Sequence, residues 1–127
     1  MKIFIKFILL LTINVSGQSF DDFLNAIHRV ETGGKIGFIY GKNGELGPLQ
    51  ITKPYWEDTN IGGKFEDCAK LDYSKKVVLA YMNKYEPKLV RLKNWEELAR
   101  LHNSGPNWRK KKMFTDAYWD KVRKVLW

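Results

Sequence analysis

The sequence contains a single cysteine, Cys68, so no disulfide can form within the chain and a stable fold must come from packing. Aromatic side chains suited to such a core are plentiful, since the 127 residues include five Trp, six Tyr and seven Phe. Cys68 itself is expected to be a small buried apolar residue. The alternatives are a disulfide between two chains, or a catalytic thiol assisted by His28 or His102.

The first 17 residues have the pattern of a secretory signal peptide. Lys2 precedes a mostly apolar run, Ile3–Ile13, and Val15-Ser16-Gly17 places small residues at the expected cleavage site. The run is shorter than the roughly 20 apolar residues of a membrane span, although a retained membrane anchor is the alternative. We therefore predict a leader over residues 1–17, no transmembrane segment in the mature chain, and one domain over residues 18–127.

The chain is basic, with a formal net charge of +8 that would fall to about +6 once Lys2 and Lys6 leave with the leader. A basic surface attracts bacterial walls, anionic membranes and nucleic acid, and charge alone does not choose between them. No recognisable nucleic-acid module and no zinc-ligand spacing accompanies it, so we expect neither a specific nucleic-acid partner nor a metal or other cofactor. The segment Trp108–Lys112 is a candidate for membrane action. Alternatively, it is a solvated basic loop that draws the protein to anionic surfaces.

The first predicted helix begins after Ser19 and ends at Gly33-Gly34. Ser19 has the role of N-cap, and Asp22 three residues later is close to a capping-box arrangement. Apolar residues then recur at helical spacing along one side of this helix: Phe20, Phe23, Leu24, Ile27 and Val30. This side is expected to face the core.

A short, irregular β-hairpin is predicted between Lys35 and Ile51. Apolar residues alternate with other residues at first, and Asn43-Gly44 is a strong signal for a hairpin turn. The return segment, Leu46–Ile51, contains Gly47 and Pro48, which prevent a long regular strand.

The rest of the chain has helical patterns. They predict a short helical turn from Pro54 to Glu57, a long helix over residues 74–85 that Pro87 ends, a helix capped by Asn94, a loop over residues 103–108, and a last helix capped by Thr115. The predicted fold class is α+β, a mostly helical fold with one small β-hairpin after the first helix.

Glu31 is the most informative single residue. It follows Ile27 by four residues and Leu24 by seven, which places it on the apolar side of the first helix. Burial and the negative end of the helix dipole would both raise its pKa. A carboxylic acid that keeps its proton near neutral pH can protonate the leaving oxygen of a glycosidic bond. The alternative is a glutamate that turns out to solvent or caps a neighbour.

Glu31 begins the first of four sequence motifs that follow one another in a fixed order. They are ETGG at residues 31–34, GPLQITKPYW at residues 47–56, VVLAYMNKY at residues 77–85 and ARLHNSGPN at residues 99–107, and similarity continues to YWDKV at residues 118–122. In these stretches, which span about 100 residues, the sequence resembles the invertebrate-type lysozymes, or destabilases, of the lysozyme-like superfamily. Each motif alone is weakly specific, whereas the ordered set is strongly specific.

The resemblance implies a lysozyme-like fold in which residues 18–127 form the catalytic domain. It implies hydrolysis of the β-1,4 bond between N-acetylmuramic acid and N-acetylglucosamine in bacterial peptidoglycan, with Glu31 as the general acid. Tyr40, Gln50, His102 and Asn103 would contact the sugar chain. The alternative for Gln50 is that it only satisfies backbone groups, and the alternative for His102 is that it caps its own helix.

The expected partners are therefore peptidoglycan glycan strands and the anionic cell-wall surface. The expected location is extracellular, or the lumen of a digestive or phagolysosomal compartment. A monomer is expected.

Two features depart from the family. The family is rich in disulfides, and it carries a second catalytic carboxylate, an Asp, in the first hairpin strand, where this chain has Tyr40. The only acid between Gly33 and Gln50 is Glu45. Glu45 either replaces the Asp as nucleophile or base, or lies in the turn without a catalytic role. In the latter case Glu31 acts alone, as in goose-type lysozymes and lytic transglycosylases.

Two other functions fit the same motifs. A lytic transglycosylase would use the same acid and leave 1,6-anhydro ends on the sugar chain. An inactive module would bind peptidoglycan without cleaving it.

Overall fold

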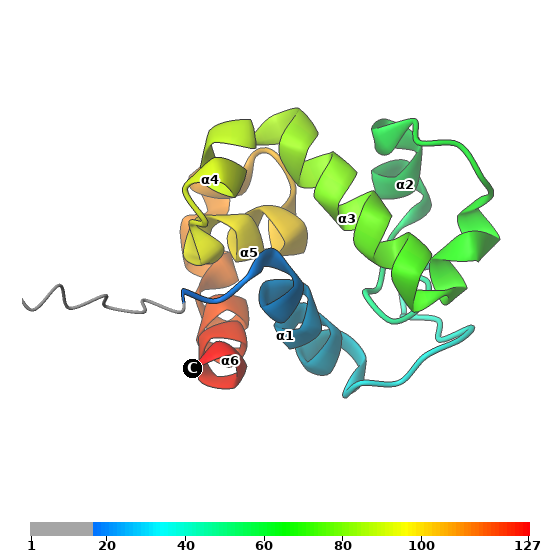
Figure 1. Ribbon diagram of the computed structural model, residues 1–127, viewed down its shortest axis with the longest axis horizontal. Coiled ribbons are helices and arrows are strands. Elements are labelled where there is room, and N and C mark those ends of the chain that lie inside the picture. The colour runs from blue at the N-terminus through cyan, green and yellow to red at the C-terminus, as the bar shows by residue number, and fades with distance from the viewer. Residues whose placement is uncertain (1–16) are drawn as a thin grey trace, which may run out of the picture.

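The computed structural model describes residues 17–127, so the predicted leader lies outside the described residues except for Gly17. Figure 1 shows a mostly helical chain. No helix in the described part combines the length and the apolar character that a membrane crossing requires. In chain order the elements are α1 (Phe20–Thr32), α2 (Lys53–Thr59), η1 (Phe65–Ala69), α3 (Leu71–Tyr85), α4 (Pro87–Arg91), α5 (Trp95–Ser104), η2 (Trp108–Thr115) and α6 (Asp116–Leu126), where η marks a 3₁₀ helix.

The capping residues set the two ends of α1 as predicted. The Ser19 hydroxyl accepts the amide of Asp22, and the Asp22 carboxylate accepts the amide of Ser19, which completes a capping box. At the other end Gly33 has φ +66°, the left-handed conformation that ends many helices and that glycine adopts without strain. Phe23, Leu24 and Ile27 face the core, so the predicted apolar side is confirmed.

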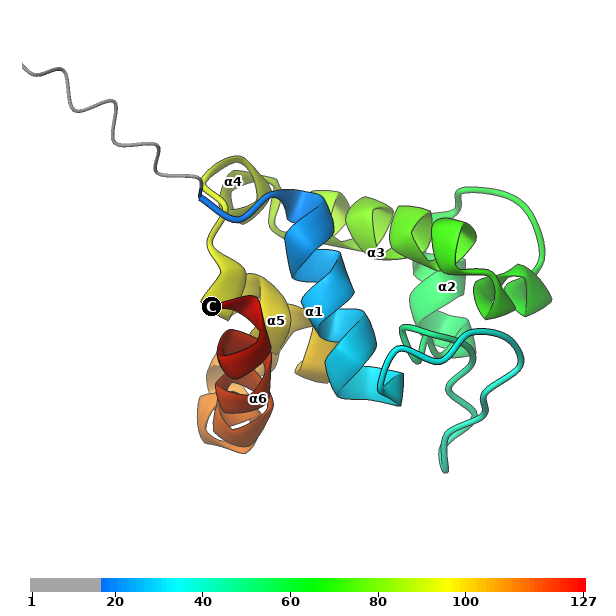
Figure 2. The ribbon, with the colours of Figure 1, turned by 60° about the horizontal axis from the view of Figure 1, so that its bottom comes forward.

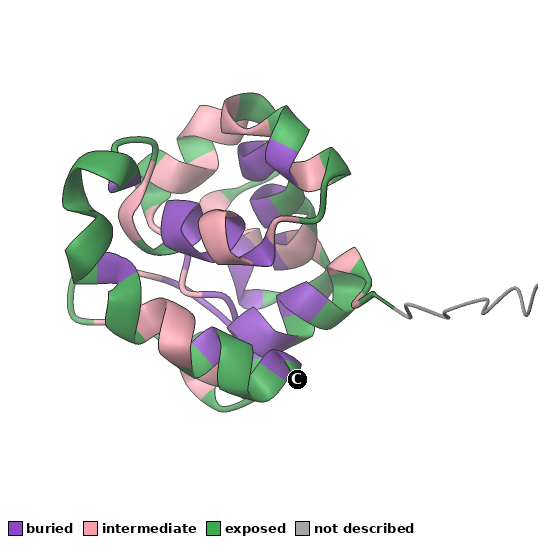
Figure 3. Cartoon of the chain, turned by 90° about the vertical axis from the view of Figure 1, so that its left-hand side faces the viewer, coloured by how far each residue is buried: buried purple, intermediate pink, exposed green. Residues whose placement is uncertain are grey.

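The helices form two groups joined by α3. In one group α1 and α5 pack on α6, and in the other α2 packs on α3, as Figures 1 and 2 show. Buried residues lie on the inward sides of the helices (Figure 3). The core includes the four motif residues Pro48, Leu49, Ile51 and Met82, which are buried.

The predicted β-hairpin is wrong. The described residues between α1 and α2 contain only isolated antiparallel bridges, Tyr40 with Leu46 and Leu46 with Ile51. A regular ladder is prevented because Pro48 has no amide hydrogen and because Gly47 and Gln50 have positive φ values of +83° and +51°. The segment is therefore an ordered loop.

Gly47 also allows a close approach that no other residue would permit. A Cβ atom at Gly47 would collide with the backbone carbonyl of Cys68. Cys68 is fully buried, as predicted, and burial raises the pKa of its thiol to about 12. The loop is thus packed directly on the segment that leads into α3.

The C-terminal half differs from the prediction at three places. Pro87 does follow α3, but it also begins α4, because proline is well tolerated in the first turn of a helix. The predicted loop over residues 103–108 is shorter, since α5 continues to Ser104 and η2 begins at Trp108. Thr115 precedes α6 without capping it.

A buried arginine explains what Thr115 does instead. Arg100 of α5 donates from Nη1 to the Thr115 hydroxyl at 2.7 Å, to the carbonyl of Lys112 at 3.0 Å and to the carboxylate of Asp116 at 2.6 Å. The Thr115 hydroxyl then donates to the same Lys112 carbonyl. These bonds tie α5 to η2 and to the start of α6, so the position of α6 relative to α5 is fixed.

Candidate active site

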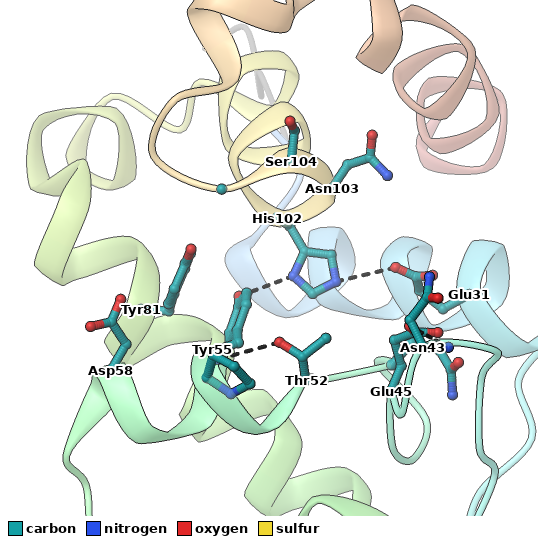
Figure 4. Close-up of a pocket in the computed structure, with 13 residues that line it drawn as sticks. Glu31, Asn43, Glu45, Thr52, Tyr55, Asp58, Tyr81, His102, Asn103 and Ser104 are labelled. Carbon is teal, nitrogen blue, oxygen red and sulfur yellow. Dashed lines mark hydrogen bonds and ion pairs between the residues drawn. The ribbon is translucent and has the colours of Figure 1, made fainter.

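A cleft of about 520 Å³ lies between the two groups of helices. Glu31 at the end of α1, the loop before α2, Tyr55 and Asp58 of α2, Tyr81 of α3 and the end of α5 all contribute to it (Figure 4). Five of the six residues predicted for the site line this cleft, namely Glu31, Glu45, Gln50, His102 and Asn103. Tyr40 is not among them: it is 64% exposed and takes part in the bridge to Leu46.

Glu31 is held from one side by a tyrosine and a histidine. The Tyr118 hydroxyl, from α6, donates a hydrogen bond to Glu31 Oε2 at 2.9 Å, and the ring nitrogen Nε2 of His102, from α5, lies 3.2 Å from the same oxygen. The side chain is 20% exposed. Next to it the Thr32 hydroxyl donates to the carbonyl of Pro48, which joins the end of α1 to the loop. Three separate segments therefore meet at this carboxyl.

The hydrogen bonds of His102 fix which ring nitrogen carries the proton in the neutral imidazole. Nε2 lies 3.2 Å from the carbonyl of Leu49, which can only accept, so Nε2 is protonated. Nδ1 then accepts from the hydroxyl of Tyr55 at 3.0 Å. The result is a chain of hydrogen bonds from Tyr55 through His102 to the carbonyl of Leu49, beside Glu31, and the ring does not cap its own helix.

The two tyrosines remain protonated donors over a wide pH range. Burial raises the pKa of Tyr55 well above its usual value, and neighbouring Tyr81 and Glu31 add to the effect. Burial likewise raises the pKa of Tyr118, with a further contribution from the Glu31 charge. The ring of Tyr55 stacks on Tyr81 at a centroid distance of 3.6 Å, so its hydroxyl is held firmly in place.

The loop side of the cleft is organised by Gln50. Its amide nitrogen donates to the carbonyls of Ile39 at 3.0 Å and Gly47 at 2.9 Å, so the side chain fixes the loop. Its φ of +51° is uncommon for a residue with a side chain. Such strained backbone is concentrated at functional sites, because the surroundings must hold it in place.

Glu45 folds back on the same loop. Its Oε1 accepts the amide of Asn43 at 3.1 Å. Gly41 makes this possible, because a Cβ atom at Gly41 would collide with the side chains of Glu45 and Gln50. Glu45 therefore combines a loop-stabilising bond with a position on the cleft wall.

The far end of the cleft contains a third acid, Asp58, which His102 and Tyr55 separate from Glu31 in Figure 4. Lys84 lies 2.9 Å from Asp58 Oδ1, and the Tyr85 hydroxyl donates to Oδ2. The hydrogen bonds from Tyr85 and Lys84 hold the pKa of Asp58 below its usual value. Asp58 is thus a fixed anion.

Sequence reasoning missed three members of this site: Tyr55, Asp58 and Tyr118. Tyr118 lies in the predicted last helix, and Tyr55 in the predicted short helical turn. The available signal was chemical, since a tyrosine on a buried helix side must find a partner for its hydroxyl. The partner itself lies 87 residues away for Tyr118 and 47 for Tyr55.

The arrangement suits proton transfer. The site offers a part-buried carboxyl that accepts a hydrogen bond from a neutral hydroxyl and has an imidazole ring 3.2 Å away. No group of three or more His, Cys, Asp or Glu side chains among residues 17–127 is placed to hold a metal ion. The fold and site together define a mostly helical domain with a cleft that carries acids at both ends.

The family model described as Destabilase matches residues 21–125 of this chain, which include every residue of the cleft. The chain therefore belongs to the destabilase family.

Curated relatives come from bivalve molluscs. A protein named Lysozyme from Ostrea edulis is 41% identical over 86 residues, which are 65% of this chain and 61% of that protein. Lysozyme 1 of Crassostrea virginica is 35% identical over 104 residues, 79% of this chain and 56% of that protein. Lysozyme of Magallana gigas is 38% identical over 104 residues, 78% of this chain and 74% of that protein. The chain thus spans about three fifths of the length of the first two relatives.

Proposed function

We propose that this chain is a lysozyme that hydrolyses the β-1,4 bond between N-acetylmuramic acid and N-acetylglucosamine in bacterial peptidoglycan. The names of the bivalve relatives support the class of reaction. Glu31 is the general acid, and the observation that carries this assignment is its part-buried position in the cleft, where Tyr118 donates to Oε2 and the His102 ring lies 3.2 Å away.

The Tyr118 hydroxyl favours one position for a proton on Glu31. Because this hydroxyl donates to Oε2, that oxygen acts as an acceptor and the proton occupies Oε1. Oε1 is then the atom that protonates the bridging oxygen of the glycan as the bond breaks. Once the proton has left, the Tyr118 hydroxyl stabilises the carboxylate, which is ready to act as a base in the following step.

Glu45 is proposed as the second carboxylate. Glycosidases use a second acid group either as nucleophile or to activate water. Asp58 is poorly suited to this role, since it is paired with Lys84 at the other end of the cleft. Glu45 has no Lys or Arg ion pair within residues 17–127, and Asn43 holds it on the cleft wall.

The wider setting follows from the same proposal. With the predicted leader removed, residues 18–127 are the secreted catalytic domain. Its basic charge would favour the anionic wall that contains the substrate. The sugar chain would bind in the cleft, against Gln50, His102 and Asn103. Tyr40 is exposed outside the cleft, so it would contact only a part of the sugar chain that extends beyond the cleft.

The test is wall hydrolysis by Glu31→Gln, which keeps the shape of the side chain but cannot carry the acidic proton. Glu57→Gln is the matched control, because Glu57 is an exposed glutamate of α2 that does not line the cleft. We expect E31Q to lose activity by about a thousandfold while E57Q keeps it.

Mass spectrometry of the released fragments identifies the reaction. Fragments with reducing ends support a hydrolase. Fragments with 1,6-anhydro ends would show that the protein is a lytic transglycosylase instead. A folded E31Q protein with full activity would refute the acid assignment. Wild-type protein that binds walls without releasing fragments would be an inactive binding module.

A further inference from the structure

The helix η2 presents six consecutive exposed residues between two buried ones. Trp108 and Thr115 are buried, and every residue from Arg109 to Phe114 is exposed. Met113 is 76% exposed and Phe114 80%, the highest value among the large exposed apolar side chains of the described residues. We call residues 110–114 the η2 knuckle.

The three lysines of the η2 knuckle carry charge that no acid neutralises. Arg109, just before it, is paired with Glu86 and Glu97. Lys110, Lys111 and Lys112 take part in none of the ion pairs found among residues 17–127. Asp116, the next acid along the chain, is paired with Arg100.

The base of the η2 knuckle is firmly held. The carbonyl of Lys112 accepts from both Arg100 and Thr115, at 3.0 and 2.6 Å. Before the knuckle, the guanidinium of Arg109 lies over the ring of Trp108 at 4.5 Å. Met113 and Phe114 therefore project from an anchored turn, and burying them in the core would require breaking these contacts.

We propose that the η2 knuckle binds an anionic phospholipid surface, with the lysines against the headgroup phosphates and Met113 and Phe114 inserted at the acyl boundary. Clustered lysines are attracted to anionic lipids, and apolar side chains beside them add binding by burial in the membrane interface. A soluble polyanion would use the lysines but give no role to the two apolar side chains. Their presence therefore favours lipid as the occupant.

The test is co-sedimentation of the protein, purified after secretion, with vesicles. One set contains phosphatidylcholine alone and the other adds phosphatidylglycerol. We expect binding to the second set only. The triple variant K110Q/K111Q/K112Q should weaken it by on the order of a hundredfold. The variant M113S/F114S, which keeps every charge, should weaken it by about tenfold.

Matched controls locate the effect. K76Q/K88Q/K121Q removes the same charge from exposed lysines elsewhere, and I36S/F38S removes two apolar side chains that are 69% and 65% exposed. Both controls should retain vesicle binding more fully than the knuckle variants. Equal losses in the controls would overturn the proposal, as would absence of binding by the wild type.

A parallel titration with soluble polyphosphate distinguishes the rival partner. If M113S/F114S binds vesicles like the wild type while K110Q/K111Q/K112Q loses both vesicles and polyphosphate, the η2 knuckle is a polyanion site and the lipid proposal fails. All the substituted positions are exposed, so unchanged thermal unfolding is expected and would show that the fold is intact.

Discussion

Glu31 and Asp58 line opposite ends of one cleft, and the groups that contact them differ in charge. The hydroxyl of Tyr118 donates to Glu31 and the ring of His102 lies beside it, and neither group has a permanent charge. Asp58 is paired with the ammonium of Lys84 and with Tyr85. A permanent cation favours the ionised acid, whereas neutral donors leave the acid able to gain and lose a proton.

Because their surroundings differ, Glu31 and Asp58 have different roles. Glu31 has the setting of a proton carrier, and Asp58 that of a structural anion which ties α2 to α3. The surroundings of Glu45 are intermediate between those of Glu31 and Asp58, because Glu45 accepts a hydrogen bond from a backbone amide but is not paired with a lysine. Substitutions at the two ends should therefore have unequal effects on activity.

The largest effect after E31Q is expected for Glu45→Gln. If Glu45 is the second carboxylate, its amide cannot act as nucleophile or base, and the rate should fall by about a hundredfold or more. The measurement is turnover of purified peptidoglycan, with Glu66→Gln as an exposed control outside the cleft. A loss of only a few-fold would show that Glu31 works without a second carboxylate.

A smaller loss, about thirtyfold, is expected for His102→Gln. The substitution removes the ring that lies 3.2 Å from Glu31 and breaks the hydrogen bonds of that ring to Tyr55 and Leu49. His28→Gln is a closely matched control, because His28 is equally buried and bonds to the carbonyl of Lys35 outside the cleft. Both variants should lose stability, but only H102Q should lose turnover at temperatures where both are folded. Equal losses of turnover in H102Q and H28Q would show that His102 only contributes to packing.

The sequence predicted local features well. Capping residues and apolar spacing placed α1, the end of α3 and the start of α5, because these features depend on residues within a few positions of one another. The hairpin prediction failed because the turn signal at Asn43-Gly44 was outweighed by Pro48 and by two residues with positive φ.

The candidate site was predictable in part for the same reason. Glu31 stands out from its own helix, and the ordered motifs bring in Gln50, His102 and Asn103. The two tyrosines did not stand out. Tyr118 meets Glu31 and Tyr55 meets His102 only through the packing of α6 and α2. Arg100, which fixes α6, likewise carries no local signal of its burial.

Tyr118→Phe should have a still smaller effect, about fivefold on turnover of purified peptidoglycan, because the carboxylate of Glu31 loses the hydroxyl that donates to its Oε2. Tyr85→Phe removes the corresponding hydroxyl at Asp58 and should leave turnover unchanged. A loss of turnover in Y85F but not in Y118F would reverse the comparison.

The smallest effect on turnover, within about twofold, is expected for Asp58→Asn, which should instead change the acid stability of the protein. The native pKa of Asp58 is lowered by Tyr85 and Lys84, so its contribution to folding is present above the unfolded value of about 3.9 and is lost as the pH falls through the native value. Denaturant unfolding should find D58N less stable than the wild type at pH 7, with the two converging in acid. Because Lys84 is half exposed, the difference at neutral pH should be small. If D58N abolished wall hydrolysis instead, Asp58 would act directly on the substrate, and the contrast between the two ends of the cleft would be lost.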